Sequence, residues 1–340
     1  MPEKNQPKPG KQRIAIAGAT GRVGSALTKL LASDPVDVVA LSRRPDAAGL
    51  PTGVTVAAID FDQPKTLENV LRGTDRLFIA HGTSPQQVAN EIALIDAAVA
   101  ARVSHIVKLS AMGPATRLNP LAWHMEIEAH LSRQPVASTA LRPSAFADIL
   151  LRRAGGQVSA GSWTGAAGEG HVNFIDTRGI AKAARVALLE DVHPESQRAY
   201  HLTGPRAWTM RQIAGELTNL LGHPVVYINR SPEEERAALL AGSLTPFVVD
   251  LFVGLEQMFR ESVLGETTST VEELTGEPPG TLSQWLLKIS RSFESRLDGG
   301  ALARSSASAP RLVSRGKAHP LVRNPKSQAP GEPEIALCKM

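Results

Sequence analysis

The chain has 340 residues, of which 42% are hydrophobic and 21% charged, and this composition predicts a packed globular core. Its net charge of +4 comes from the ends: residues 1–13 hold four Lys and Arg against one Glu, residues 293–340 hold eight against four, and the part between therefore carries −3. A nucleic-acid groove needs clustered basic residues on the folded part, so we expect no nucleic-acid partner there. The one cysteine, Cys338, excludes an intrachain disulfide.

The N-terminal residues 1–12 are predicted to form a disordered leader. No apolar segment precedes the first predicted strand, which argues against a secretory signal and favours a cytoplasmic protein. That strand is a short apolar run, as buried parallel strands are. It begins at Arg13 and breaks at Gly18, and a helical pattern then continues to about Ala32.

The turn between this strand and helix has three glycines in a G-x-x-G-x-x-G pattern. The first permits a sharp turn, the second a close approach of the backbone to a pyrophosphate, and the third close packing of the helix on the sheet. The N–H groups at the helix start would face the negative charge of the ligand. An ordinary tight strand–helix turn is the alternative. The predicted cofactor residues here are Gly18, Thr20, Gly21, Arg22, Val23 and Gly24.

Apolar strands and helices continue to alternate along the first half of the chain. Strands are predicted at 36–42, 54–59, 76–80 and 105–109, and helices at 66–72, 86–102 and 121–133. This alternation predicts an α/β fold, a Rossmann-type doubly wound parallel sheet. Such sheets bind ligands at the carboxyl ends of their strands. The further cofactor residues predicted at these ends are Arg43, Arg44, Asp60, Phe61, Ala80, His81 and Pro143.

The second half is predicted to be mostly helical and to cover one side of the cofactor cleft. Residues 155–170 are predicted to be a loop or irregular hairpin, and Asp176 to be the N-cap of a helix over 177–189. Further extended segments are expected at 171–175, 200–202 and 225–228, with helices at 209–221 (ended by Gly222), 232–241, 246–260 and 281–291. The apolar stretch 237–259 is broken by Pro246 and Asp250, so it predicts two packed helices and no transmembrane segment.

The predicted division is a leader (1–12), a dinucleotide-binding Rossmann part (13–153), a smaller substrate-covering part (154–292) and a disordered basic tail (293–340). The tail is either a solvated extension or a contact for an acidic partner or membrane surface.

The end of the second strand bears on the choice of nicotinamide cofactor. An acidic residue there binds the ribose hydroxyl of NAD, whereas arginine accommodates the 2′-phosphate of NADP. This strand ends in Ser42-Arg43-Arg44. Two guanidinium groups can form paired hydrogen bonds with a phosphate, so NADP(H) is predicted over NAD. The alternative is that both are ordinary solvated arginines.

The chain resembles the NmrA-like group of atypical short-chain dehydrogenases/reductases over about residues 12–290. The segments that carry the resemblance are 18–24, 42–44, 105–111, 123–131, 139–146, 174–181, 202–205 and 273–279. The resemblance implies binding of NADP(H) or NAD(P). It also implies one of two functions, because some members reduce quinones or related carbonyl and alkene compounds, whereas others are regulators that sense the dinucleotide and do no known chemistry.

The residues that could handle protons depart from the standard pattern of short-chain dehydrogenases. The pair Tyr-x-x-x-Lys is absent, since Gly204 and Ser231 stand four residues after Tyr200 and Tyr227. The resemblance implies that His124 stands in place of the lysine that some plant reductase relatives have at the start of the helix after the fifth strand, as it does in quinone-reductase-like members.

His124 and Glu128 are four residues apart, so they share a helix face, and the carboxylate could orient the imidazole for acid–base chemistry. A structural histidine is the alternative. Ser110 either meets the substrate or nicotinamide ribose, or only caps its strand, and His81 is expected to line the cofactor path.

These features predict catalytic roles for His124, Glu128 and Ser110, and no Cys or His spacing suggests a metal. The predicted activity is hydride transfer from NADPH to a small-molecule substrate such as a quinone, by a monomer or homodimer. The alternative is a non-catalytic regulator that binds NADP(H) and reports its redox state to a partner.

Overall fold

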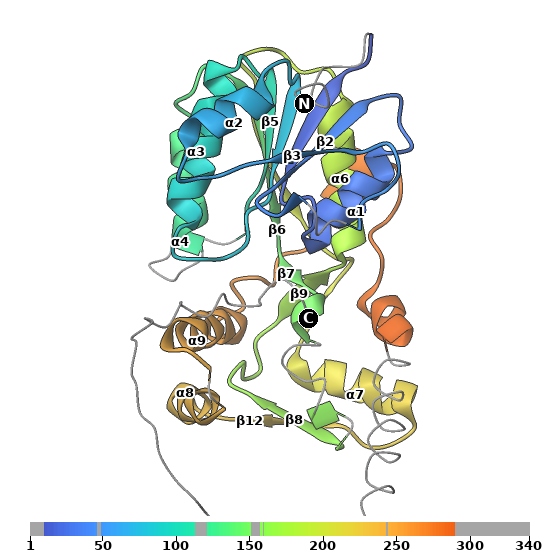
Figure 1. Ribbon diagram of the computed structural model, residues 1–340. Coiled ribbons are helices and arrows are strands. Elements are labelled where there is room, and N and C mark those ends of the chain that lie inside the picture. The colour runs from blue at the N-terminus through green and yellow to red at the C-terminus, as the bar shows by residue number, and fades with distance from the viewer. Residues whose placement is uncertain are drawn as a thin grey trace, which may run out of the picture.

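A parallel sheet of seven strands forms the centre of the molecule (Figure 1). The computed structural model describes residues 10–45, 49–112, 121–150, 157–158, 160–242 and 244–289, so most of the predicted leader and the predicted tail lie outside them. In spatial order the strands are β3 (Thr55–Ala58), β2 (Asp37–Ser42), β1 (Arg13–Ala17), β4 (Arg76–Ile79), β5 (His105–Leu109), β6 (Ala137–Pro143) and β10 (Gln197–Leu202). Every neighbouring pair is parallel, which confirms the predicted Rossmann-type sheet.

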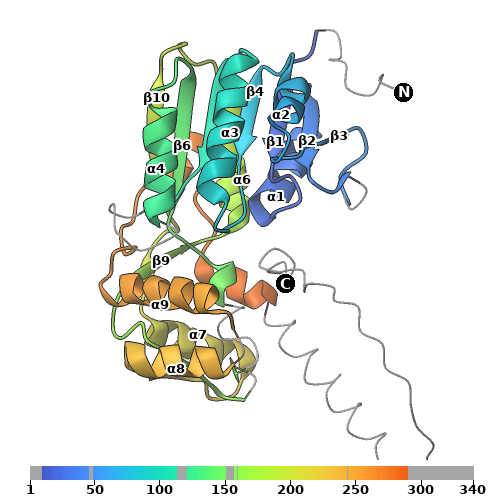
Figure 2. The same ribbon diagram turned by 60° about the vertical axis from the view of Figure 1, so that its left-hand side comes forward.

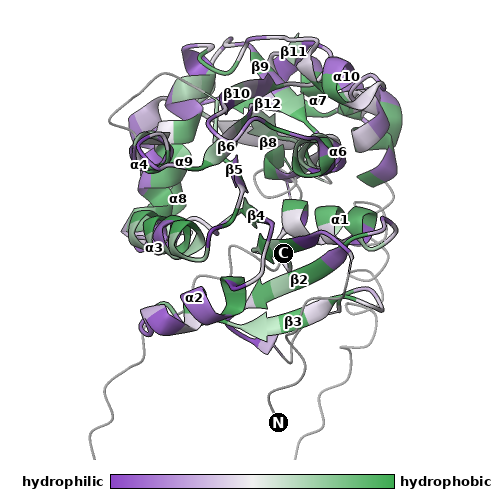
Figure 3. Ribbon diagram, turned by 90° about the horizontal axis from the view of Figure 1, so that it is seen from above, coloured by the Kyte–Doolittle hydropathy of each residue, from purple (hydrophilic) through white to green (hydrophobic). Residues whose placement is uncertain are grey.

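Helices cover both faces of this sheet. On one face lie α1 (Arg22–Leu31) and α6 (Thr177–Leu189), and on the other lie α2 (Pro64–Leu71), α3 (Gln87–Ala100) and α4 (Leu121–Leu131). Side chains of β1 alternate between two apolar clusters, with Ile14 and Ile16 in one and Ala15 and Ala17 in the other. Burial on both faces explains why the strand reads as a continuous apolar run. Figure 3 shows the hydrophobic colouring on β2 and the hydrophilic colouring on α2.

A second lobe lies beyond the carboxyl ends of the strands (Figure 2). It contains a small sheet, a two-stranded parallel pair and three further helices around their own apolar cluster. These elements are β7 (Ala145–Phe146), β9 (Val172–Ile175) and β11 (Ala207–Trp208), then β8 (Ser162–Gly165) with β12 (Val226–Asn229), then α7 (Met210–Leu221), α8 (Pro232–Ala241) and α9 (Pro246–Arg260). The helix α10 (Thr270–Thr275) packs against α6, and residues 282–289 are helical.

Several local predictions for this half are confirmed. The Asp176 carboxylate accepts from the N–H of Arg178 and caps α6, and Gly222 ends α7 in the left-handed conformation. The apolar stretch across 237–259 is divided between α8 and α9. None of the described helices is long and apolar enough to cross a membrane.

The prediction of a loop or irregular hairpin over residues 155–170 is wrong for Ser162–Gly165, which form a strand. A strand, β8, pairs in parallel with β12 from more than 60 residues later, as in the register Trp163 to Tyr227. Local turn composition could not reveal a partner so distant in sequence. The sheet is also completed by β10 and covered by α6, both of which come from the segment that the sequence assigned to the covering part.

Candidate cofactor and substrate site

The glycine-rich turn packs so tightly that side chains are excluded at two positions. Gly18 has φ +85°, and a Cβ there would lie 2.1 Å from the carbonyl oxygen of Ala80 at the end of β4. A Cβ at Gly24 would lie 2.1 Å from the carbonyl oxygen of Gly18. Both contacts are far inside van der Waals distance, so the turn requires glycine to bring α1 against β1 and β4.

The N-terminus of α1 has the features of an anion site. Its N-cap is Gly21, no side chain caps it, and its first turn holds no acidic residue. The first N–H groups of a helix lack intrahelical partners and carry its positive dipole end. Thr20 is exposed and Arg22 half-buried beside this end, whereas Val23 packs into the core. A pyrophosphate could therefore be held by backbone N–H groups here.

Basic residues follow β2, whereas an acidic residue, Asp60, follows β3. Arg43 and Arg44 are exposed directly after β2, and the N–H of Arg44 donates to Ser42 Oγ at 3.0 Å. The Asp60 carboxylate accepts from the N–H of Asp62 at 3.0 Å and from Gln63 Nε2 at 2.8 Å, so it shapes its own loop. The arginines thus supply positive charge at the position that selects between NAD and NADP.

His81 follows β4 and is held as a neutral ring. Its Nε2 lies 3.0 Å from Asn90 Nδ2, and because an amide nitrogen can only donate, Nε2 accepts. Nδ1 therefore carries the proton and donates to the carbonyl of Gly82 at 2.6 Å. Burial lowers the pKa of His81. Its ring meets Phe61 edge-on, with centroids 5.7 Å apart. These two aromatic residues, predicted at separate strand ends, are therefore neighbours.

The partner predicted for Glu128 is corrected by the structure. Its carboxylate is held by Arg142 on β6, whose Nη2 is 2.6 Å from Oε2, and by Ser110 Oγ, which donates to Oε1. The hydrogen bond with Glu128 raises the pKa of Arg142. Glu128 shares the helix with His124 as predicted, but it is turned to the strands. The Ser110 hydroxyl is therefore occupied by its hydrogen bond to the Glu128 carboxylate.

His124 instead contacts Lys108, a residue that the sequence analysis missed. Lys108 is fully buried in β5, and its Nζ lies 3.1 Å from His124 Nδ1. Burial, and secondly the charge of Lys108, lower the pKa of His124 well below its ordinary value. The ring is half-buried at the start of α4, and Lys108 also donates to the carbonyl of Leu109, at the carboxyl end of β5. His124 therefore stands at the sheet edge where such folds bind ligands.

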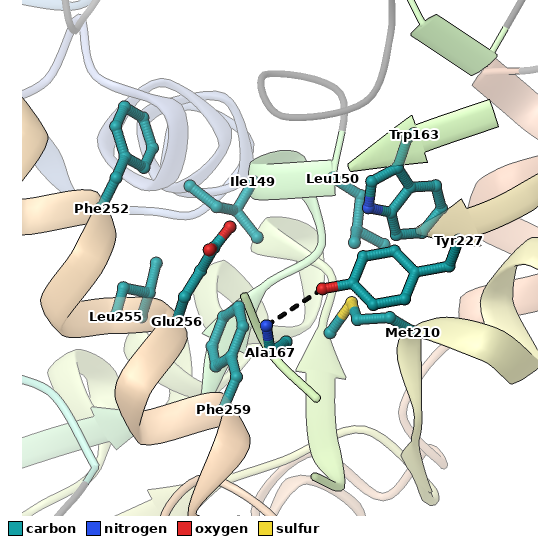
Figure 4. A pocket seen from close by; sticks show the side chains of 10 residues that line it. All are labelled: Ile149, Leu150, Trp163, Ala167, Met210, Tyr227, Phe252, Leu255, Glu256 and Phe259. Carbon is teal, nitrogen blue, oxygen red and sulfur yellow. Dashed lines mark hydrogen bonds between the residues drawn. The ribbon is translucent and has the colours of Figure 1, made fainter. Parts of the chain in front are cut away.

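Pro143 ends β6 at the same edge, where its carbonyl accepts from the N–H of Met112 at 2.9 Å. The chain then passes through β7 to an apolar pocket in the second lobe (Figure 4). This pocket has an aromatic and aliphatic wall with two polar groups, the Tyr227 hydroxyl and the Glu256 carboxylate, which accept from Ala167 N at 3.0 Å and Ala166 N at 2.7 Å. The other lining residues are Ile149, Leu150, Trp163, Met210, Phe252, Leu255 and Phe259.

No group of three or more His, Cys, Asp and Glu that could hold a metal ion occurs among the residues that the structure describes. The groups available at the sheet edge are the N-terminus of α1, two arginines and a neutral histidine.

Comparisons with known proteins agree with this geometry. Residues 18–172 match a family of NAD(P)H-binding domains. The NAD(P)H azoreductase of Xenophilus azovorans is 31% identical over 286 residues, which cover 82% of this chain and 99% of that protein. Quinone oxidoreductase 2 of Escherichia coli is 30% identical over 277 residues, covering 80% and 96%.

Solved structures with the same fold include a reductase and a regulator. An NADPH-dependent quinone oxidoreductase from Escherichia coli complexed with NADPH superposes with a TM-score of 0.75 at 29% identity, over 81% of this chain and 99% of that one. NmrA, a negative transcriptional regulator solved in complex with NAD, has a TM-score of 0.66 at 15% identity over 85% and 98%, a likeness that shows the fold alone. This chain belongs to the NmrA-like family of atypical short-chain dehydrogenases/reductases and is a reductase that uses NADP(H).

Proposed function

We propose that the enzyme reduces a small planar electrophile of the quinone class with NADPH. The observation that carries the proposal is His124, a half-buried imidazole of lowered pKa at the carboxyl end of β5. The names of the relatives, a quinone oxidoreductase and an azoreductase, support an acceptor of this kind. We further propose that the apolar wall of the second-lobe pocket contacts the acceptor.

The cofactor residues are proposed in three groups. Gly18, Thr20, Gly21, Val23 and Gly24 hold the pyrophosphate at the start of α1, because the turn keeps the backbone accessible and the helix end uncapped. Arg43 and Arg44, with Arg22, bind the 2′-phosphate of NADPH. Asp60, Phe61, Ala80, His81 and Pro143 line the rest of the cofactor path at the carboxyl ends of β3, β4 and β6.

The reaction needs one hydride and one proton. When bound, NADPH supplies the hydride, that is, two electrons and one proton. A quinone then needs one more proton to become a hydroquinone, while NADPH becomes NADP⁺. His124 is placed to donate a hydrogen bond to the reacting oxygen. Glu128 and Ser110 are proposed as positioning residues. Ser110 and Arg142 donate hydrogen bonds to the Glu128 carboxylate, and these bonds connect α4 to the carboxyl ends of β5 and β6.

The test follows NADPH oxidation by absorbance across a panel of quinones, enones and azo dyes. We expect turnover with at least one quinone and a fall in kcat of about 10²–10⁴ in His124→Ala, with NADPH affinity little changed. His193→Ala, at an exposed histidine, is the matched control. Absence of turnover with every acceptor, together with different affinities for NADPH and NADP⁺, would instead favour the redox-sensing function. We also propose a cytoplasmic monomer or homodimer, which sedimentation and fractionation would check.

A further inference from the structure

The ammonium group of Lys108 has three partners, an ion-paired carboxylate and two hydrogen-bonding groups. Its Nζ lies 2.6 Å from Glu91 Oε2, 2.8 Å from the carbonyl oxygen of Leu109 and 3.1 Å from His124 Nδ1. A lysine ammonium has no acceptor. Because Nζ can only donate while it is charged, the nitrogen of His124 that faces it must accept.

The charge on Lys108 is matched inside the protein. Glu91, on α3, is as fully buried as Lys108, and its Oε1 accepts from Gln87 Nε2 at 2.9 Å. The Glu91 carboxylate lies opposite the ammonium group and compensates its charge. A buried ion pair seldom contributes more to stability than apolar residues of the same size. Stability alone therefore does not explain why Lys108 stands near the carboxyl end of β5.

We propose that the buried Lys108–Glu91 pair positions His124, fixing its neutral Nε2–H tautomer and directing that N–H to the substrate. The inference rests on the proposed function and names the donor group of the same site. With Nδ1 accepting from Lys108, the one proton of the neutral ring is on Nε2. Burial and the positive charge of Lys108 both oppose a second proton, so they lower the pKa of His124.

Among the described residues, charged side chains from β5, α3 and α4 lie on the side of the fold where His124 stands. Lys108 comes from β5 and Glu91 from α3, while Glu128 of the same helix is held by Ser110 and Arg142. Among these groups, the ammonium is the one that contacts the ring. The imidazole therefore acts as a neutral hydrogen-bond donor to the developing oxygen anion, and the second proton of the reduction comes from water.

The experiment is a nitrogen-detected NMR titration of the full chain labelled with ¹⁵N-histidine, with the His124 signals assigned by their loss in His124→Gln. In the wild-type protein we expect an unprotonated Nδ1 and a protonated Nε2, unchanged from about pH 6 to 8 around the ordinary histidine pKa of about 6.5. This measurement needs no variant of the ion pair and no substrate.

The variant Lys108→Met/Glu91→Gln removes both charges together and leaves neither ion unpaired. We expect both tautomers of His124 to become populated and its titration midpoint to rise. In assays with an active acceptor, kcat should fall about 10–100-fold, the range for partners that orient a functional histidine, with KM for NADPH unchanged. Lys182→Met, at an exposed lysine paired with Glu277, is the control and should leave the His124 signals unchanged.

Protonation of Nδ1 in the wild-type protein, a charged ring at pH 7, or an unchanged tautomer in the double variant would each overturn the inference. Absence of turnover with every acceptor would overturn the proposed function and leave the NMR result standing. Conversely, quinone turnover by a protein whose His124 carries its proton on Nδ1 would support the proposed activity and reject this role of Lys108.

Discussion

Protonation of His105 should make the protein lose stability in mild acid. This histidine begins β5, at the edge of the sheet away from the ligand site, and is fully buried. Its Nδ1 accepts from Arg76 Nη1 at 3.1 Å, and its Nε2 then donates to Thr139 Oγ1 at 2.9 Å. Burial, and next the charges of Arg76 and Arg198, lower the pKa of His105 to about 3.

The folded and unfolded states of the protein bind a proton on His105 at different pH values. In the unfolded chain histidine titrates near pH 6.5, whereas in the folded protein His105 stays neutral down to about pH 3. The unfolded state therefore binds more protons between these values, and stability falls as the pH falls from about 6.5 to 3. At about 1.4 kcal/mol per pKa unit the full loss is about 5 kcal/mol, of which about 2.5 kcal/mol appears between pH 7 and 4.5.

Urea unfolding of wild type and His105→Gln at pH 7 and 4.5 measures this loss. Glutamine can accept from Arg76 and donate to Thr139 but does not titrate. We expect the variant to lose about 2.5 kcal/mol less than wild type between the two pH values. His81 and His124 also have lowered pKa values, but both are present in each protein and so cancel in the comparison. Equal losses in the two proteins would refute the argument.

Three further predictions concern the site. Gly24→Ala should destabilise the protein by about 1–3 kcal/mol in thermal melts, because its Cβ would collide with the carbonyl of Gly18, whereas Gly215→Ala, in open space on α7, should not. Arg43→Ala/Arg44→Ala should reduce the preference for NADPH over NADH in calorimetric titrations about 10–100-fold, or about 1.4–2.8 kcal/mol, and an unchanged preference would contradict the assignment. The control is Arg72→Ala/Arg133→Ala, at exposed arginines after α2 and α4. Phe252→Ala should raise KM for an apolar acceptor and leave kcat unchanged, while Leu240→Ala, outside the pocket, should alter neither.

Local patterns in the sequence were enough to predict the sheet and the edge at which its ligand residues gather. An apolar run followed by spaced glycines specifies β1, the turn and α1 together, and chain alternation places later strand ends at the same edge. The caps Asp176 and Gly222 could also be predicted from the sequence, because a capping residue lies next to the helix that it begins or ends.

The side-chain partners were harder to predict, because they come from separate elements. The four-residue spacing of His124 and Glu128 predicted that they share one face of α4. In the structure, Arg142 on β6 and Ser110 after β5 bind the Glu128 carboxylate. The imidazole of His124 instead contacts Lys108. A signal was available in Lys108 itself, a lysine inside an apolar strand, because a buried ammonium requires a carboxylate or other acceptors nearby. The sequence alone could not say that Glu91 is that carboxylate.

The route of the chain between the two lobes has a consequence for how such enzymes can diversify. After β6 the chain leaves the sheet for β7, returns from β9 through α6 to β10, and leaves again for β11. Ile180, Ala184 and Leu188 of α6 complete the apolar layer over β1, so a fragment ending near residue 153 lacks part of its own core. The second lobe is therefore not a contiguous segment that recombination can exchange in one piece, because the chain that forms it also completes the central sheet and its apolar layer.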